Sequence, residues 1–299
     1  FVVYGMFDGF VDINKRALAD PTVRQMFIPD TWLTSNFFVA TLLAGFAIFC
    51  LPRQFHVTFV ENDDSRNLIS ARWLFPAYLI AINIFVVPIA IAGLFMFGDD
   101  PTVNPDTFVL TLPLLGEQNW LAVVAFIGGL SASTGMVIVS CVAVSTMVCN
   151  DLVMPLLLRS ERLQKRMSGD VSQVLLKIRR AAVILILFLA YGFYRFLADN
   201  YALADIGMLS FAAMAQFGPA VLAAIYLKNI NRTGVRLGLI SGFVLWGYTL
   251  LVPAFVQGGL LPPSILVNGP FGIGILNPQA LLGVGIEDHL THGVVWSLG

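Results

Sequence analysis

Residues 119–148 read NWLAVVAFIGGLSASTGMVIVSCVAVSTMV. This run carries no charge and exceeds the roughly 20 residues that a helix needs to cross the hydrocarbon core of a bilayer. Its middle nevertheless holds several hydroxyls and glycines. A buried hydroxyl at membrane depth costs free energy unless it finds a partner, so a simple lipid anchor does not need it. We therefore expect a membrane helix that packs tightly, lines an ion or solute path, or does both.

The composition of the whole chain fits a membrane protein. Of its 299 residues, 58% are hydrophobic and 12% are charged, and the mean hydropathy is +0.82. Ordinary soluble domains carry about 25% charged residues, so we predict an all-α polytopic membrane protein. The net charge of −1 excludes a nucleic-acid-binding protein that relies on a basic surface. The sequence contains no phosphate loop, nucleotide fingerprint or nucleophile elbow, so we expect no enzyme active site.

Further apolar runs of membrane-crossing length extend this prediction along the chain. We expect residues 1–10 to be the end of an earlier helix and residues 291–299 to be the start of a later one. On that interpretation the chain is an interior portion of a longer protein and forms a single transmembrane domain. The full spans are predicted at 34–52, 73–97, 119–148, 181–197, 205–227 and 235–256.

The charges of the loops predict the orientation of these spans. Lys and Arg gather in alternate loops, and the loops between contain neither. Under the positive-inside rule the basic loops are cytoplasmic. Segment 11–33 is the exception, because it is expected outside and yet contains three basic residues. The basic loops are 53–72, 149–180 and 228–236, and those without Lys or Arg are 98–118, 198–204 and 257–290.

The hydroxyls of 119–148 are candidate ion ligands. Ser133 and Thr134 are adjacent, Gly135 follows them, and Ser131 lies close by. Oxygen atoms at mid-membrane suit a hard monovalent cation such as Na⁺. The alternative is that these hydroxyls bond to carbonyls of their own helix and only permit close packing. The residue pattern leaves both interpretations open.

A second candidate site follows from the sequence Gln-Phe-Gly-Pro at 216–219, inside the span 205–227. Proline removes a backbone donor and the preceding glycine loosens the same turn, which predicts a hinge or a kink that lines a site. The alternative is a kink that serves only packing. The candidate solute-binding or gating residues are Gln216, Gly218, Pro219 and Ser210, together with Asn36 and Phe37 at the start of 34–52.

Two weaker patterns have structural interpretations. Gly234, Gly238 and Gly242 form two consecutive GxxxG steps, which predict a face for close helix packing. His289 and His292 have the i, i+3 spacing of a metal pair, but no third ligand accompanies them. We therefore expect no metal site at these two histidines.

Three blocks of the sequence resemble the sodium:solute symporter family, whose members have the LeuT-type inverted-repeat fold. The first is GFAIFCLPRQFHV at 45–57, and the second is the hydroxyl-rich stretch 131–151, which closes on an Asp-Leu pair. The third, 209–242, contains FGPAVLAAIYLKNINRTGVRLGLISG. The resemblance implies a helix bundle in which the spans from 34–52 to 205–227 form the second five-helix repeat, with the first repeat upstream of Phe1.

The resemblance also implies functional residues. In this family, adjacent hydroxyls on the eighth core helix bind sodium, and that helix would be 119–148. Ser133 and Thr134 are the best matches for the sodium ligands. Counted back from Asp151, the family's hydroxyl pair falls nearer Gly135 and Met136.

The sequences LPRQFHVTFVEN, SASTGMVIV and THGVVWSL resemble those of the symporter-like membrane domains of bacterial sensor histidine kinases of the CbrA type. This implies sodium- or proton-coupled transport of a small organic solute, an amino acid such as histidine, across the bacterial inner membrane. The alternative is a solute-sensing receptor domain with little or no net transport. The implied partners are the solute, the lipid bilayer, fused cytoplasmic kinase modules and a response regulator. We expect no nucleic acid and no cofactor other than Na⁺.

Overall fold

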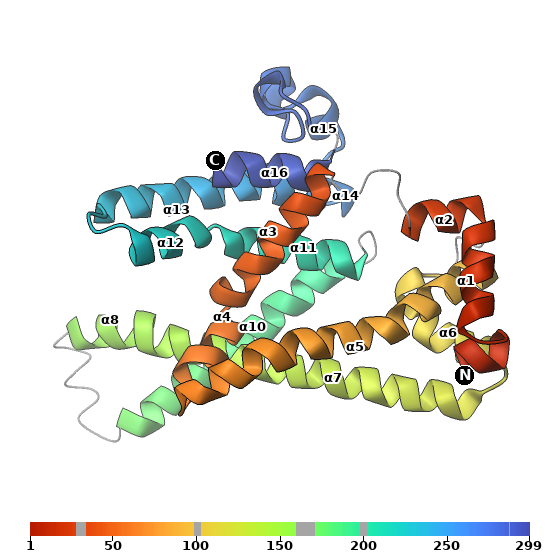
Figure 1. Cartoon of the computed structure of the whole chain (residues 1–299). Helices are drawn as coiled ribbons and strands as arrows, with labels where there is room; N and C mark the ends of the chain where they lie inside the picture. Colours follow the sequence, from red (N-terminus) through yellow and green to blue (C-terminus); the bar gives the residue numbers. More distant parts are fainter. Residues whose placement is uncertain (28–33, 99–102, 160–170, 198–201, 287) are drawn as a thin grey trace. The chain divides into compact units, whose positions relative to one another are not determined.

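The computed structural model describes residues 1–27, 34–98, 103–159, 171–197, 202–286 and 288–299, and all secondary structure within these ranges is helical (Figure 1). The chain divides into two compact units. The first comprises Phe1–Trp32 and Glu61–Val137, and the second comprises Leu33–Val60 and Ile138–Gly299. Several of the charged loop residues that predict the orientation, in 99–100, 161–166, 199 and 287, lie outside the described residues.

The first unit is built around a long apolar helix, α5. Asp64 caps this helix by accepting from the backbone nitrogen of Arg66 at 2.8 Å, and it also forms an ion pair with the Arg66 guanidinium at 2.8 Å. These hydrogen bonds hold the pKa of Asp64 below its usual value. The elements of the unit are η1 (Val2–Met6), α1 (Phe10–Ala19), α2 (Pro21–Phe27), α5 (Ser65–Phe97), η3 (Pro105–Thr107), α6 (Phe108–Leu115) and the first part of α7 (Asn119–Met147).

The core of the first unit lies where α5 meets α6. Ile91 and Ala92 of α5 are buried with Phe108 and Leu112 of α6. Gly93 allows this close approach, because a Cβ atom there would lie 2.0 Å from Cδ2 of Phe108. The glycine therefore sets the distance between the two helices.

The second unit packs around helix α16. This helix lies along α13 and also contacts α3 and α11 (Figure 1). Leu43 of α3, Ala212 of α11 and Val294 of α16 are buried in this core. The elements are α3 (Ser35–Cys50), α4 (Pro52–Phe55), η2 (His56–Val60), η4 (Val148–Val153), α8 (Met154–Arg159), α10 (Val171–Leu197), α11 (Leu203–Ala215), α12 (Gly218–Tyr226), α13 (Arg232–Trp246), η6 (Gly247–Leu251), α14 (Val252–Gln257), α15 (Ser264–Asn268), η7 (Pro270–Gly272), η8 (Gly274–Leu276), η9 (Leu281–Gly283) and α16 (His289–Leu298).

Within the described residues, four helical segments are long and apolar enough to cross a membrane: Ser65–Phe97, Asn119–Leu156, Leu203–Tyr226 and Arg232–Gln257. A fifth span results if α3 and the following helix, which are bent by 48° at Leu51, are counted as one. These segments overlap the predicted spans at 34–52, 73–97, 119–148, 205–227 and 235–256. The predicted span 181–197 falls within α10, which is not among the four.

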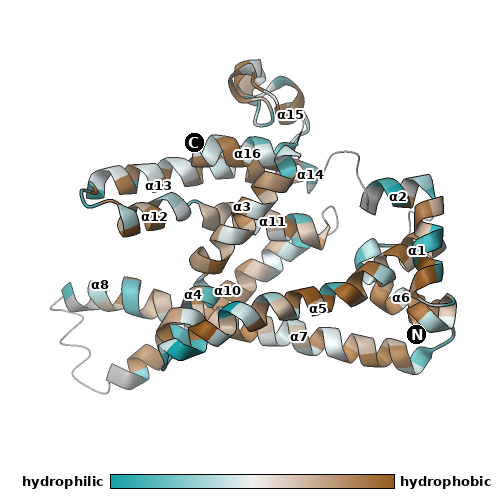
Figure 2. Cartoon of the chain, in the orientation of Figure 1, coloured by the Kyte–Doolittle hydropathy of each residue, from teal (hydrophilic) through white to brown (hydrophobic). Residues whose placement is uncertain are grey.

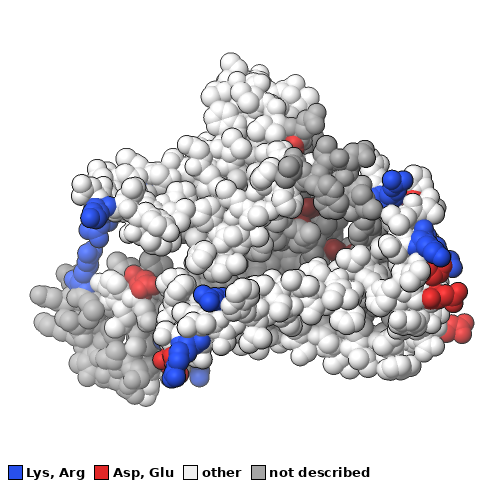
Figure 3. All heavy atoms as spheres, in the orientation of Figure 1, with Lys and Arg blue, Asp and Glu red and all other residues white. Residues whose placement is uncertain are grey.

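The surfaces of these helices are those of a protein in lipid. Only 6% of the most apolar window of Asn119–Leu156 is buried, and 22% of that of Ser65–Phe97. Both helices are hydrophobic along most of their length (Figure 2), and on the face shown in Figure 3 few of the described residues are Lys, Arg, Asp or Glu. Soluble proteins rarely expose apolar surface of this extent, whereas helices in a bilayer require it. In the part of the chain that the structure describes, all secondary structure is helical, and the exposed apolar helices are those of a membrane-embedded protein.

Candidate functional site: a helix break beside a polar cavity

Within the apolar segment Leu203–Tyr226 the α-helix is interrupted for two residues, at the turn where the sequence predicts a hinge or a kink. Helix α11 ends at Ala215 and α12 begins at Gly218. At the break the backbone nitrogens of Gln216 and Phe217 donate to carbonyls only three residues earlier, at 3.3 and 3.1 Å. Pro219 has no N–H to donate to the carbonyl four residues before it. The helix therefore tightens for one turn and starts again.

The amide of Gln216 is held between three helices. Its side chain is only 5% exposed, and its Nε2 donates to the carbonyl of Ala212 at 3.1 Å and to Oγ of Ser297 at 2.9 Å. Its Oε1 faces Gly242 of α13, where a Cβ atom would lie 2.5 Å from this oxygen. The buried amide thus joins the broken helix to α16 and packs against α13.

A cavity of about 450 Å³ opens at this break, and we call it the break cavity. Its polar side chains are those of Gln216, Ser241 and Ser297, while Pro219 and Trp296 contribute apolar wall. The volume falls in the range of roughly 300–1,000 Å³ that is typical of small-molecule sites. A few polar groups in an apolar lining are also typical of such sites. The remaining lining residues are Ala220, Ala223, Gly234, Val235, Gly238, Leu239, Leu245, Leu298 and Gly299.

Gly218 lines a different, apolar cavity of about 530 Å³ together with Phe46 and Phe49 of α3. A Cβ atom on Gly218 would lie 2.5 Å from Cε1 of Phe46. The glycine is therefore required for contact between the start of α12 and the Phe46 ring. Two of the predicted solute residues, Gln216 and Pro219, therefore line the break cavity. Gly218, which lies between them in the sequence, packs against Phe46 instead.

The other predicted solute or gating residues lie outside both cavities. Asn36, Phe37 and Ser210 are exposed. The hydroxyl of Ser210 donates to the carbonyl of Ile206 at 2.9 Å, and the backbone nitrogen of Phe37 donates to the capping hydroxyl of Thr34 at 3.3 Å. These contacts are local to α11 and to the start of α3.

The predicted ion ligands belong to the part of α7 in the first unit. Ser131, Ser133 and Thr134 are exposed there. The hydroxyls of Ser133 and Thr134 both donate to the carbonyl of Leu130, at 3.1 and 2.7 Å. This is the bonding that the packing interpretation describes. A hydroxyl that donates keeps its lone pairs, so the same oxygens can still coordinate a cation.

Groups of three or more His, Cys, Asp or Glu side chains able to hold a metal ion are absent from the described part of the chain. Hydroxyl and carbonyl oxygens, which are the ligands that Na⁺ would use, do not belong to these groups. His292 is fully buried whereas His289 is exposed. The two histidines, at which the sequence predicts no metal site, therefore lie in different surroundings.

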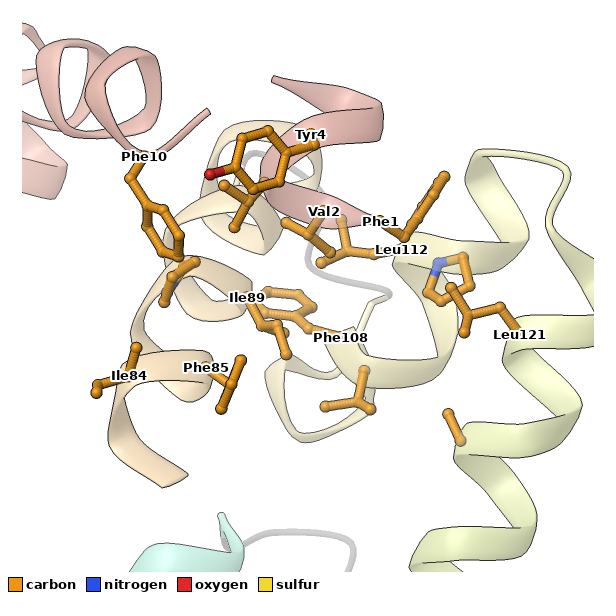
Figure 4. A pocket seen from close by; sticks show the side chains of 15 residues that line it. Phe1, Val2, Tyr4, Phe10, Ile84, Phe85, Ile89, Phe108, Leu112 and Leu121 are labelled. Atoms are coloured by element: carbon orange, nitrogen blue, oxygen red, sulfur yellow. The ribbon is translucent and has the colours of Figure 1, made fainter. Parts of the chain in front are cut away.

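The first unit contains an apolar cavity of about 380 Å³ between η1, α5, α6 and α7. Figure 4 shows Phe10, Ile89 and Phe108 around it, with the ring of Tyr4 at its edge. Tyr4 carries the one polar side chain among the lining residues. This lining offers no charged group for ion or proton chemistry.

Sequence reasoning missed Ser297 and Phe46. Ser297 lies in an apolar run, 81 positions from Gln216, and its hydroxyl was the one signal that could have marked it. Phe46 carries no signal in the sequence, because one phenylalanine among many in apolar helices does not indicate which glycine it contacts.

No protein-family model, no curated protein and no solved structure matches this chain.

Proposed function

We propose that this chain forms the solute-binding part of a membrane transporter with the LeuT-type symporter fold. It would move a small organic solute, an amino acid such as histidine, by alternating access. The observation that carries the proposal is the break at 216–219, where a buried amide lines a cavity of solute size inside a membrane-length apolar helix.

Broken helices have a specific use in transporters. Irregular backbone at membrane depth is tolerated where it is buried in protein or lines a cavity. In many secondary transporters such breaks lie at the substrate site near the midplane of the membrane. The break in this chain is both buried in protein and beside a cavity, because Gln216 is buried and lines the break cavity.

The chemistry of the lining fits an uncharged or zwitterionic solute. A glutamine amide both donates and accepts hydrogen bonds, as do the hydroxyls of Ser241 and Ser297. Among the residues that the structure describes, no Asp, Glu, Lys or Arg side chain lines the break cavity. A solute whose amino and carboxylate charges cancel would therefore leave no net charge to be neutralised by the protein.

The coupling ion in this proposal is Na⁺ bound at Ser133 and Thr134, with a proton as the alternative. Its support is the adjacent pair of hydroxyl oxygens on an apolar helix. The same solute site could serve a fused kinase as a receptor, through a shift between two conformations that the solute binds with different affinity. The sequence blocks at 51–62 and 291–298 support that second function.

The test is uptake of labelled histidine by the full-length protein in proteoliposomes, with and without an inward Na⁺ gradient. Gln216→Ala should lower uptake at least roughly tenfold, because it removes the buried amide that lines the break cavity and leaves the Ser297 hydroxyl without its partner. Ser210→Ala is the matched control, since this exposed residue lies outside the break cavity. Pro219→Ala tests the break itself with no loss of a polar group.

Wild-type uptake by both Gln216→Ala and Pro219→Ala would refute the assignment of the break as the solute site. Solute binding by the wild-type protein without any uptake would favour the receptor function over transport.

A further inference from the structure

A separate cavity of about 330 Å³ lies in the second unit at the start of α16. It shares no residue with the break cavity, and we call it the acidic cavity. Its polar side chains come from α11, η6, α14, α16 and the segment between α15 and α16. They are Asp205, Thr249, Gln257, Gln279, Asp288 and His289, and the apolar ones are Met208, Leu209, Leu250, Pro253, Ala254 and Leu290.

The Asp side chains of this lining are negatively charged, and no Lys or Arg of the described residues opposes them. Asp205 and Asp288 contribute two carboxylates, and neither Lys nor Arg is among the lining residues. The amide oxygens of Gln257 and Gln279 add hydrogen-bond acceptors. The cavity therefore favours a ligand that carries positive charge and N–H donors.

Asp288 is held in place while part of its carboxylate stays available. It caps α16, and its Oδ2 accepts from the backbone nitrogen of Thr291 at 2.8 Å and also from the Thr291 hydroxyl. Both bonds use the same oxygen. A ligand can thus bind at Oδ1 without breaking the cap.

The helix opposite Asp288 is irregular at this point. The π-helical turn η6 interrupts the segment from α13 to α14 and supplies Thr249 and Leu250 to the cavity. Such π-turns inside α-helices occur frequently at functional sites. Gly293 of α16 packs directly on Leu250, since a Cβ atom there would lie 2.3 Å from its Cγ. The turn is thereby fixed against α16.

A buried imidazole lies on the same helix, one turn beyond the cavity, although it is not one of the lining residues. His292, one turn beyond His289, is fully buried. Neither of its ring nitrogens makes a hydrogen bond of regular geometry within the described residues, although the backbone of Pro278 interacts with the ring. Pro278 precedes Gln279 of the cavity. Buried polar groups without regular partners are rare in proteins, and a bound water or ion is one explanation for such a group.

We propose that the acidic cavity binds a small organic ammonium ion, a primary amine with a short apolar body. The carboxylates and amide oxygens would receive the ammonium group, and the apolar wall would hold the hydrocarbon. This wall favours an organic cation over a bare metal ion, which would need more oxygen ligands. The site is additional to the break cavity and does not depend on the proposed transport.

The test is binding of n-butylammonium to the purified full-length protein in zwitterionic lipid nanodiscs, measured by titration calorimetry. Butyrate, with a similar short apolar body and the opposite charge, is the comparison ligand. Asp205→Asn and Asp288→Asn should each weaken n-butylammonium binding roughly ten- to hundredfold, because a charged hydrogen bond becomes neutral. Asparagine is also a good N-cap, so Asp288→Asn keeps the start of α16.

Asp63→Asn is the matched control, because this exposed carboxylate belongs to the other unit and should leave binding unchanged.

The proposal is overturned if the wild-type protein fails to bind n-butylammonium at millimolar concentration, or if butyrate binds as well. Wild-type affinity in both Asp→Asn variants would overturn it too.

Discussion

The side-chain amide of Gln216 donates to the hydroxyl of Ser297 at 2.9 Å, and the two residues are 81 positions apart in the chain. Both side chains are buried. This bond anchors the end of α11 to α16, so the break is fixed on its N-terminal side. Any hinge motion at the break would therefore move α12 about Gly218 more readily than it would move Gln216.

The Gln216–Ser297 bond should be measurable as a coupling energy. Gln216→Ala and Ser297→Ala should each lower the free energy of unfolding by about 1–3 kcal/mol, because each leaves a buried polar partner unsatisfied. The double variant should cost about 1 kcal/mol less than the sum of the two. Equilibrium unfolding in mixed micelles measures these values. Additive effects would show that the bond contributes nothing.

The glycines of α13 should differ in their tolerance of alanine. Gly242→Ala should destabilise the protein by about 1–3 kcal/mol through overpacking, since its Cβ would lie 2.5 Å from Oε1 of Gln216 and 3.1 Å from the carbonyl oxygen of Ser297. Gly238→Ala is the control, because nothing lies within 4 Å of its Cβ position. Thermal unfolding of the two variants measures the difference, and equal melting temperatures would contradict the close packing at Gly242.

The contact between Gly218 and Phe46 should respond to a paired change. Gly218→Ala should lower both uptake and stability, because the new methyl meets the Phe46 ring at 2.5 Å. Phe46→Leu in the same protein should recover part of the loss by removing the ring. Gly207→Ala, in open surroundings on α11, should have little effect. Failure of the second change to recover any stability would rule out this steric cause.

Replacement of both hydroxyls in Ser133→Ala plus Thr134→Ala separates the two interpretations of helix α7. The fold should survive within about 0.5 kcal/mol, because both side chains are exposed and bond to their own helix. If these oxygens bind Na⁺, the Na⁺ dependence of histidine uptake should disappear in this variant. Uptake that retains its wild-type Na⁺ dependence would leave only the packing interpretation.

The first unit offers a test of its own packing. Gly93→Ala should destabilise it by about 1–3 kcal/mol, because the Cβ would lie 2.0 Å from Cδ2 of Phe108. Gly128→Ala, on the exposed face of α7, has open space around its Cβ and should be neutral or slightly stabilising. Protection of α5 amides in hydrogen exchange reports the difference directly. Unchanged protection in Gly93→Ala would refute the tight contact between α5 and α6.

The sequence by itself determined the local features of this protein. Uninterrupted apolar runs require helices in a bilayer, because every backbone group must find its partner within the segment. The missing N–H of Pro219 and the loose turn at Gly218 determined where the segment 205–227 breaks. These are consequences of covalent structure and near neighbours, so they can be read without knowledge of the fold.

The tertiary structure alone decided which residues meet. A membrane helix that is apolar on all sides has no amphipathic stripe to indicate its buried face, so Gly238 and Gly242 look equivalent in sequence. Contact with Gln216 and Ser297 distinguishes Gly242. The partner of Gln216 and the convergence of Asp205 with Asp288 depend in the same way on the packing of helices distant in the chain. Such contacts follow from shape complementarity between helices, which residue periodicity does not encode.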